Sequence, residues 1–181
     1  MIKNFHLIVL FLLLLIVPAR SEYWVVFCPK GDATGKCVAE IDAAKKQILI
    51  DAYGFTSVPI GAALQAAVKR GVEVKCVLDK SNLTSKKSLA LVLMKDGVPV
   101  WIDFHPPISH EKAFIIDATL SRRRVMFGSF NPTGQGQKNN EDWQCFWNTP
   151  GFVEAYVGNW KLRQSLSVPW AQYAKMKGVA K

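Results

Sequence analysis

Short apolar runs alternate with amphipathic stretches along most of the chain. Runs rich in Val, Ile and Phe favour strands, whereas apolar residues that recur every three or four positions favour helices. Strands are predicted at residues 23–29, 47–53, 72–78, 98–102, 109–117, 124–127 and 143–147. Helices are predicted at 35–46, 59–70, 85–95 and 150–165. The alternation predicts an α/β fold in which a mixed central β-sheet carries helices on both faces.

The first 21 residues have the pattern of a signal peptide. Lys3 precedes an apolar stretch at 7–17, and Ala19-x-Ser21 has the small residues found before a signal peptidase cut, so the mature chain is expected to begin at Glu22. The sequence therefore predicts an exported protein, periplasmic or secreted. The apolar stretch is short for a membrane-spanning helix, and an uncleaved leader that tethers the protein to a membrane stays open as the alternative.

Residues 22–181 are expected to form a single domain, because no Pro/Gly/Ser-rich linker or low-complexity tract divides them. Residues 1–21 contain Lys3, Arg20 and no acidic residue, so their removal leaves 21 basic and 14 acidic residues, a net charge of +7. A basic surface of this kind favours polyanionic partners such as nucleic acid.

The candidate chemistry lies in the string His-Glu-Lys-Ala-Phe-Ile-Ile-Asp, which contains His110, Lys112 and Asp117. On a strand, alternate side chains share a face, so His110 and Lys112 are predicted to point the same way, roughly 6.5 to 7 Å apart. Both can then touch one bound phosphate. Asp117 falls on the opposite face and is expected to orient neighbouring groups by accepting hydrogen bonds, without touching the substrate.

A second segment, Gly128-Ser129-Phe130-Asn131, follows ten residues after Asp117. A neutral imidazole such as that of His110 is a nucleophile and proton carrier near neutral pH, and a Lys supplies fixed positive charge to phosphate oxygens. Ser129 and Asn131 add uncharged donors, and Gly128 lets the backbone approach a phosphate closely. These residue types predict phosphodiester chemistry.

These two segments resemble the signature of the phospholipase D superfamily, His-x-Lys-x4-Asp followed by Gly-Ser-x-Asn. The chain also resembles the small bacterial endonucleases of that superfamily that carry one motif per chain, through Phe27 to Gly31, Tyr53 to Ser57 and Asn139 to Asp142. It departs from them at Asp142, where relatives often have Asn, and in the lengthened hairpin Ser121 to Arg124.

The resemblance implies a homodimer, because family members bring two motifs together and this chain has one. His110 of one subunit would attack phosphorus and form a phosphohistidine, while His110 of the other would protonate the departing oxygen. Glu141 is the candidate to hold the far nitrogen of each imidazole protonated. No cofactor is expected. A metal site is disfavoured because Lys112 would repel a cation and no Cys-x-x-Cys or His-x-x-x-His pair occurs.

Three functions remain open. The preferred one is a weakly specific, metal-independent endonuclease acting on DNA, with RNA as a further substrate. The first alternative is a phospholipase acting on lipid headgroups, because the motif itself recognises only a phosphodiester. The second is a basic nucleic-acid-binding protein without turnover, which the full set of catalytic residue types argues against.

The sequence also leads to predictions for the three consecutive arginines and for the four cysteines. Arg122, Arg123 and Arg124 lie in the hairpin between the two motif segments and are expected near the active face, where contact with a nucleic-acid backbone and simple solvation are both open. In an exported protein, Cys28 and Cys37 are the better candidates for a disulfide, because they flank a Gly-containing loop. The other two cysteines lie in apolar strands and are expected to be buried thiols.

Overall fold

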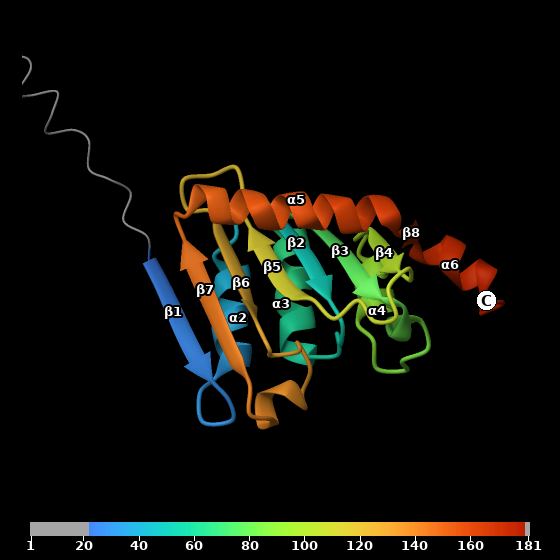
Figure 1. Ribbon diagram of the computed structural model, residues 1–181, viewed down its shortest axis with the longest axis horizontal. Helices are drawn as coiled ribbons and strands as arrows, with labels where there is room; N and C mark the ends of the chain where they lie inside the picture. Colours follow the sequence, from blue (N-terminus) through green and yellow to red (C-terminus); the bar gives the residue numbers. More distant parts are fainter. Residues whose placement is uncertain (1–21, 180–181) are drawn as a thin grey trace, which may run out of the picture.

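The computed structural model describes residues 22–179, so the predicted leader lies outside the described part of the chain. These residues form one mixed sheet of eight strands in the order β1-β7-β6-β5-β2-β3-β4-β8 (Figure 1). The strands are β1 (Glu22–Phe27), β2 (Gln47–Ala52), β3 (Glu73–Asp79), β4 (Val100–Asp103), β5 (Lys112–Ile116), β6 (Arg124–Gly128), β7 (Asp142–Trp147) and β8 (Val168–Pro169). The helices are α2 (Ala33–Asp42), α3 (Val58–Lys69), α4 (Ala90–Lys95), α5 (Pro150–Leu166) and α6 (Trp170–Met176), with 3-10 turns at Lys80–Leu83 and Gly136–Lys138.

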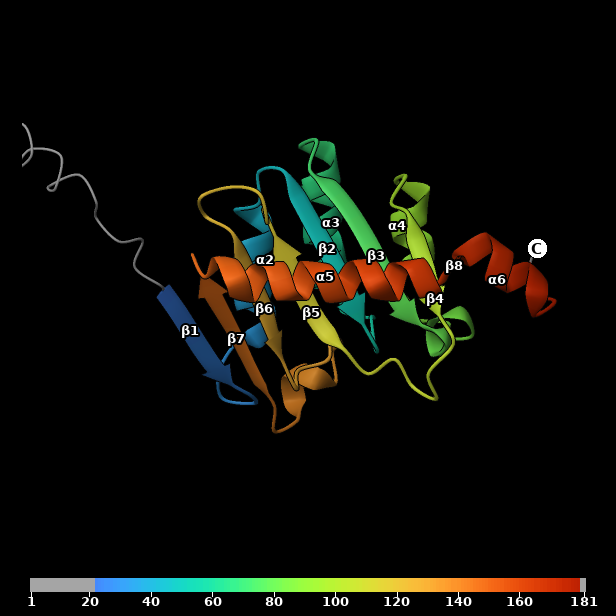
Figure 2. The ribbon, with the colours of Figure 1, turned by 45° about the horizontal axis from the view of Figure 1, so that its top comes forward.

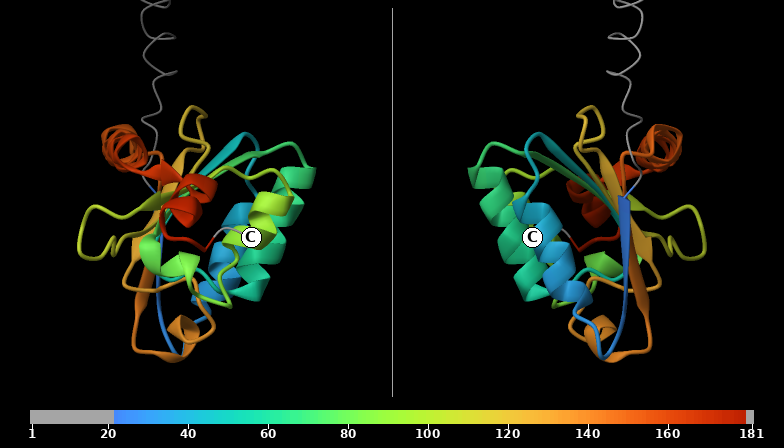
Figure 3. Two further views of the ribbon diagram at one scale, coloured as in Figure 1. Left: turned by 90° about the vertical axis from the view of Figure 1, so that its right-hand side faces the viewer. Right: turned by 90° about the vertical axis from the view of Figure 1, so that its left-hand side faces the viewer.

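Helices cover both faces of the sheet, as the sequence predicts. The α2, α3 and α4 helices lie against one face, and α5 crosses the other face over the central strands (Figures 1 and 3). The first face buries the main core, which includes Ile41 of α2 and Leu64 of α3. The second core is smaller, and there α5 buries Val153 and Trp160 against the sheet. No helix among residues 22–179 is long and apolar enough to cross a membrane.

The sheet topology brings several strand ends to one edge. The β2, β3 and β4 strands are parallel, whereas β5, β6 and β7 pair antiparallel with their neighbours. The strands β1, β2, β3 and β6 therefore end at the same edge where β5 and β7 begin (Figure 2). We call this the motif edge, because the residues just before β5 and just after β6 belong to the two motif segments.

Three predicted elements differ from those observed by three residues or more at one end, and the first of them, the helix predicted at 35–46, ends at Asp42. The strand predicted at 109–117 is limited to β5, so His110 precedes the strand and Asp117 follows it with φ at +52°. The helix predicted at 85–95 begins only at Ala90, and in the turn before it the Ser88 hydroxyl accepts a hydrogen bond from the Ala90 amide and donates one to Asn82. The short elements β8 and α6 have no counterpart among the predicted ones.

All four cysteines are free, buried thiols, so the predicted Cys28–Cys37 disulfide is not formed in this structure. Both side chains pack in the main core, where burial raises the pKa of each thiol. The loop between them is held instead by Asp32, whose carboxylate accepts a 2.7 Å hydrogen bond from the Gly35 amide. Cys76 and Cys145 are buried, as predicted.

Candidate active site

His110 and Lys112 contact the same aromatic ring at the motif edge. The His110 ring lies 4.8 Å, centroid to centroid, from the ring of Tyr53, which follows β2. The Lys112 ammonium lies 5.5 Å from the centre of that ring and donates a 2.6 Å hydrogen bond to the His110 carbonyl oxygen. The two side chains therefore share one side of the chain, as the alternation predicts. The histidine is exposed and the lysine is buried.

The electrostatic surroundings of Lys112 suit an anion. Burial lowers the pKa of its ammonium, while the neighbouring carboxylates of Glu111 and Glu141 act in the opposite direction. A cation that water solvates poorly gains more from a phosphate oxygen than an exposed one does. The buried Lys112 ammonium therefore favours an anionic ligand beside His110.

The turn after β6 supplies the uncharged donors. Gly128 has φ at +154°, and a Cβ there would lie 2.4 Å from the Asp142 carbonyl oxygen, so this position requires glycine. Ser129 Oγ accepts a 3.0 Å hydrogen bond from the Asp142 amide, and the Ser129 amide donates to the Asp142 carboxylate at 3.3 Å. Because Oγ is held as an acceptor, its hydroxyl hydrogen remains available to donate to a phosphate.

Asn131 lies beside the loop that carries Tyr53. The Pro132 carbonyl accepts hydrogen bonds from the amides of Thr56 and Ser57, at 3.0 and 2.9 Å, and so joins the two loops. Gly54 lies next to the Asn131 amide, since a Cβ there would lie 3.6 Å from Oδ1, in van der Waals contact. That buried oxygen has no hydrogen-bond partner among residues 22–179. The structure thus brings both motif segments to one edge.

The Glu141 carboxylate acts on Lys112 through its charge, and its Oε1 accepts a 3.2 Å hydrogen bond from the Asn139 side chain. Within the described part of the single chain, the hydrogen bond from His110 to Glu141 that the sequence led us to expect is not formed. The role assigned to Glu141 stays a prediction.

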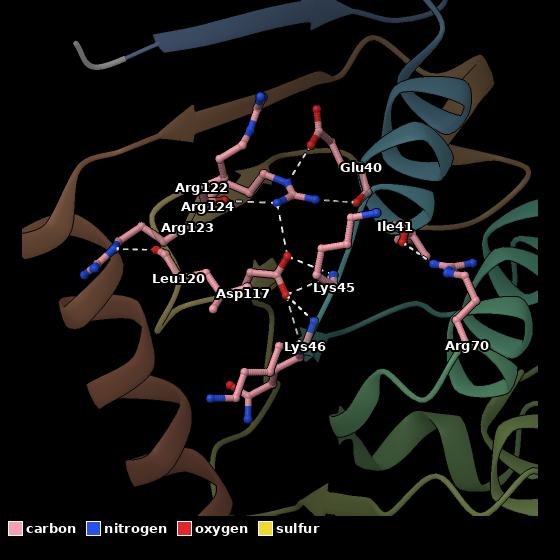
Figure 4. Close-up of polar contacts among 11 residues, drawn as sticks. Glu40, Ile41, Lys45, Lys46, Arg70, Asp117, Leu120, Arg122, Arg123 and Arg124 are labelled. Carbon is pink, nitrogen blue, oxygen red and sulfur yellow. Dashed lines mark hydrogen bonds and ion pairs between the residues drawn. The ribbon is translucent and has the colours of Figure 1, made fainter. Parts of the chain in front are cut away.

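The motif in the sequence groups Asp117 with His110 and Lys112 as a catalytic residue. In the structure Asp117 lies at the opposite end of β5 from His110, so this grouping is corrected. Its carboxylate accepts hydrogen bonds from the amides of Lys45, Lys46 and Gln47, at 3.0, 2.7 and 3.1 Å (Figure 4). Seven residues of extended chain span roughly 23 Å, too far for contact with the histidine. The expectation that Asp117 orients neighbouring groups by accepting hydrogen bonds is confirmed, and these groups are the backbone leading into β2.

The three hairpin arginines also lie at the far end of β5, away from the motif edge. Arg124 is buried and forms a 2.6 Å ion pair with Glu40, and its guanidinium lies 3.6 Å from the Asp117 carboxylate (Figure 4). Arg123 donates to the Leu120 carbonyl at 3.1 Å, and Arg122 is exposed. Antiparallel pairing places the hairpin opposite the end where the motif segments meet, so the expected position near the active face is wrong.

Sequence reasoning missed a buried carboxylate beside His110. Asp51 of β2 is 3% exposed and lines a cavity of about 230 Å³ that His110, Glu111 and Arg163 also line. Both of its carboxylate oxygens lack partners among residues 22–179. Burial, together with the negative charges of Glu111 and Asp103, raises its pKa to about 7, and Arg163 opposes them. The only signal in the sequence is an Asp inside an apolar strand.

Metal binding has no candidate cluster in the described chain. No group of three or more His, Cys, Asp or Glu side chains within residues 22–179 is arranged to hold a metal ion. The Lys112 ammonium, which donates a hydrogen bond to the His110 carbonyl oxygen, would repel a cation.

An exposed histidine, a buried lysine and a Ser/Asn turn at one edge of a mixed sheet define a phosphodiesterase site. The family described as "Cardiolipin synthase, PLD-like domain" matches residues 37–160, more than half of the chain. The chain therefore belongs to the phospholipase D superfamily, and it is a phosphodiesterase of the small type with one motif per chain.

Relatives and solved structures agree with this placement. A protein named phospholipase D from Rickettsia bellii is 35% identical over 147 residues, covering 81% of this chain and 71% of its own. Human mitochondrial cardiolipin hydrolase is 30% identical over 120 residues, covering 64% and 46%. The crystal structure of Nuc, a phospholipase D family member from Salmonella typhimurium, superposes with a TM-score of 0.77 at 35% identity and covers 83% of this chain and 98% of its own.

Proposed function

We propose that the protein is an exported, metal-independent endonuclease of low sequence specificity that hydrolyses DNA, with RNA as a second substrate. The observation that carries this proposal is the exposed His110 standing directly beside the buried Lys112 ammonium at an open edge. His110 is placed to attack phosphorus, and Lys112 and Ser129 to bind the phosphate oxygens.

The reaction proceeds in two displacements. A nitrogen of His110 forms a bond to phosphorus as the bond to the leaving oxygen breaks, and that oxygen takes a proton from His110 of a second subunit. Water then cleaves the phosphohistidine, with the second imidazole accepting its proton. One chain carries one copy of the His-x-Lys-x4-Asp motif, so a homodimer with a shared site supplies the acid.

Charge supports a polyanionic substrate even though the hairpin arginines are remote. Three exposed lysines lie in loops of the motif edge: Lys30 follows β1, Lys138 follows β6, and Lys177 borders the cavity that Tyr53 lines. The predicted mature charge is +7. Contacts to phosphates alone position a strand without reading bases, which accounts for low sequence specificity.

Plasmid cleavage in excess EDTA tests the proposal, with His110→Ala and Lys112→Ala as catalytic variants and Arg122→Ser as the matched control. The wild type and the control should nick supercoiled DNA, and both catalytic variants should lose the activity. A purified heterodimer with one His110→Ala subunit should also lose most multiple-turnover activity. Half the wild-type rate in that heterodimer would indicate independent sites, and dependence on a divalent ion would overturn the mechanism.

A phospholipase is the second candidate, and two observations favour it. The relatives carry the names phospholipase D and mitochondrial cardiolipin hydrolase. The edge strand β1 also exposes large apolar side chains, with Tyr23 and Phe27 at 68% and 66%. Vesicles that contain cardiolipin or phosphatidylcholine separate the two functions: headgroup release without DNA cleavage by the wild-type protein would replace the nuclease with the lipase.

A further inference from the structure

Two buried carboxylates hold the residue immediately before His110. The Ser109 amide donates a 2.8 Å hydrogen bond to Asp79 Oδ2, and the Ser109 hydroxyl donates a 3.0 Å hydrogen bond to Asp103 Oδ2. Asp79 ends β3 and Asp103 ends β4, and both side chains are buried, as is Ser109. The backbone that leads into His110 is therefore fixed on its N-terminal side.

Asp103 also joins this segment to α5. Arg163, in the last turn of that helix, donates from Nε to Asp103 Oδ2 at 2.7 Å, and its Nη2 contacts the same oxygen. One carboxylate oxygen thus receives the Ser109 hydroxyl and the Arg163 guanidinium. We call Ser109, Asp103 and Arg163 the serine clamp.

The histidine depends on its backbone for its position. Its imidazole forms no hydrogen bond within residues 22–179, and it packs against the tilted ring of Tyr53. On the C-terminal side, the Glu111 carbonyl accepts a 2.9 Å hydrogen bond from the Tyr53 amide. Ser109 and Glu111 therefore fix the chain on either side of His110.

Asp103 of the clamp takes part in a pairing that is unfavourable for the stability of the sheet. Asp79 and Asp103 are direct partners in the parallel β3–β4 register, and like charges opposite one another destabilise a sheet. The two donors of Ser109 and the guanidinium of Arg163 offset that repulsion. An element that breaks a local rule and is then compensated is expected at functional sites.

We infer that the serine clamp positions His110 for attack on phosphorus, with Ser109, Asp103 and Arg163 acting as positioning residues that do not touch the substrate. The inference rests on the proposed role of His110. Small errors of placement are costly for a nucleophile, since a misplacement of about 1 Å can lower a rate roughly 100-fold.

The test uses Ser109→Ala and Asp103→Asn, with Ser109→Thr as the conservative variant that keeps the hydroxyl. Ser165→Ala is the matched control, because its hydroxyl bonds only the Leu162 carbonyl on the same helix. Hydrolysis of bis(p-nitrophenyl) phosphate gives kcat and KM. Loss of the clamp should lower kcat about 10- to 100-fold, while KM changes less than about twofold, because placement and not binding is affected. Ser109→Thr should recover most of kcat, and the control should match the wild type.

Imidazole NMR supplies a readout that is independent of turnover. The predicted mature chain has two histidines, His105 and His110, so their side-chain signals can be assigned with one His110→Ala sample. Ser109→Ala and Asp103→Asn should shift the His110 signals at temperatures where the proteins stay folded, and Ser165→Ala should leave them in place. A merely structural clamp would lower the unfolding temperature without moving these signals or kcat per folded molecule.

The outcomes separate the inference from the proposed function. Wild-type kcat and unmoved His110 signals in both clamp variants would overturn the clamp. If His110→Ala itself remained active, the proposed function would fail, while the NMR comparison would still decide whether the clamp sets the position of the imidazole. Arg163→Gln and Ser109→Ala should also be non-additive in kcat, because both act through Asp103 Oδ2; full additivity would contradict a shared route.

Discussion

Replacing Asp51 by Asn should change how the stability of the protein depends on pH. The Asp51 carboxylate lies between the sheet and α5 with both oxygens unpaired among residues 22–179. Glu111 and Asp103 face it with negative charge, and Arg163 supplies a partial offset. Ionised Asp51 is therefore destabilising in the folded state, and the Asp51→Asn substitution would keep the shape of the side chain while removing its charge.

The sign and size follow from the pKa, which burial raises from 3.8 to about 7. Between these values the unfolded chain has lost the Asp51 proton while the folded chain retains it, so the free energy of unfolding falls as pH rises. The loss is complete above the folded pKa of about 7. A shift of about three pKa units corresponds to at most ~4 kcal/mol.

Urea unfolding of both proteins at pH 5 and pH 8 checks this reasoning, with Asp42→Asn as the control because Asp42 is exposed. The stability of Asp51→Asn relative to the wild type should increase by about 2 to 3 kcal/mol from pH 5 to pH 8, while the control stays within about 0.5 kcal/mol. An unchanged difference between pH 5 and pH 8 would refute the assignment of a raised pKa to Asp51.

Three further outcomes are expected. Asp117→Asn should lower the free energy of unfolding by about 3 kcal/mol, because it leaves Arg124 with less compensating charge and weakens three hydrogen bonds from the backbone. The kcat per folded molecule should stay near that of the wild type, and a selective loss of kcat would restore a catalytic role for Asp117. Gly128→Ala should reduce kcat at least tenfold by forcing Ser129 away from Asp142, as a crystal structure of the variant would show. Thiol titration should count free cysteines only after unfolding, and a reductant should leave the denaturation midpoint unchanged; a shifted midpoint would indicate a disulfide.

Hydrophobic patterning was sufficient to predict most of the sheet and its covering helices, because buried strands and amphipathic helices carry different periods. It failed at the ends of elements where polar contacts occur. Ser88 forms hydrogen bonds in the turn before α4, and Asp117 leaves the strand with φ at +52°. The short elements β8 and α6 are too small to carry a clear period.

The sequence predicted the relative positions of site residues correctly where they are neighbours in sequence. It failed where the distance between two residues along a strand determines whether they meet. His110 and Lys112 are two positions apart, so alternation alone fixes their common side. Asp117 is five positions beyond Lys112, and alternation gives its face but not its distance from His110. The arginine hairpin was misplaced for a related reason: the pairing of Ala113 with Phe127 brings the motif segments together and sends the intervening turn to the far end.

Residues from distant segments escaped prediction because only strand register brings them together. Asp51 faces Glu111 because β2 pairs with β5, and Asp79 lies beside Asp103 because β3 pairs with β4. Each partner is separated in sequence by intervening elements that follow no motif spacing. The sequence shows only a charged residue in an otherwise apolar strand. Such a residue is expected to be buried, but the pattern does not show which residue it contacts.

The spacing within His-x-Lys-x4-Asp gains a physical meaning from this strand. Lys112 is the first residue of β5 and Asp117 directly follows its last, so the four intervening residues are the apolar part of the buried strand. Lys112 belongs to the proposed phosphate site at one end, while Asp117 binds the backbone that leads into the neighbouring β2 at the other. Tyr53 directly follows β2, and its ring contacts His110. By fixing the start of β2, Asp117 therefore also fixes the position of the Tyr53 ring along the sheet. The aspartate of the motif thus sets the position of the strands, whereas the lysine and histidine are the residues proposed to act on the phosphate.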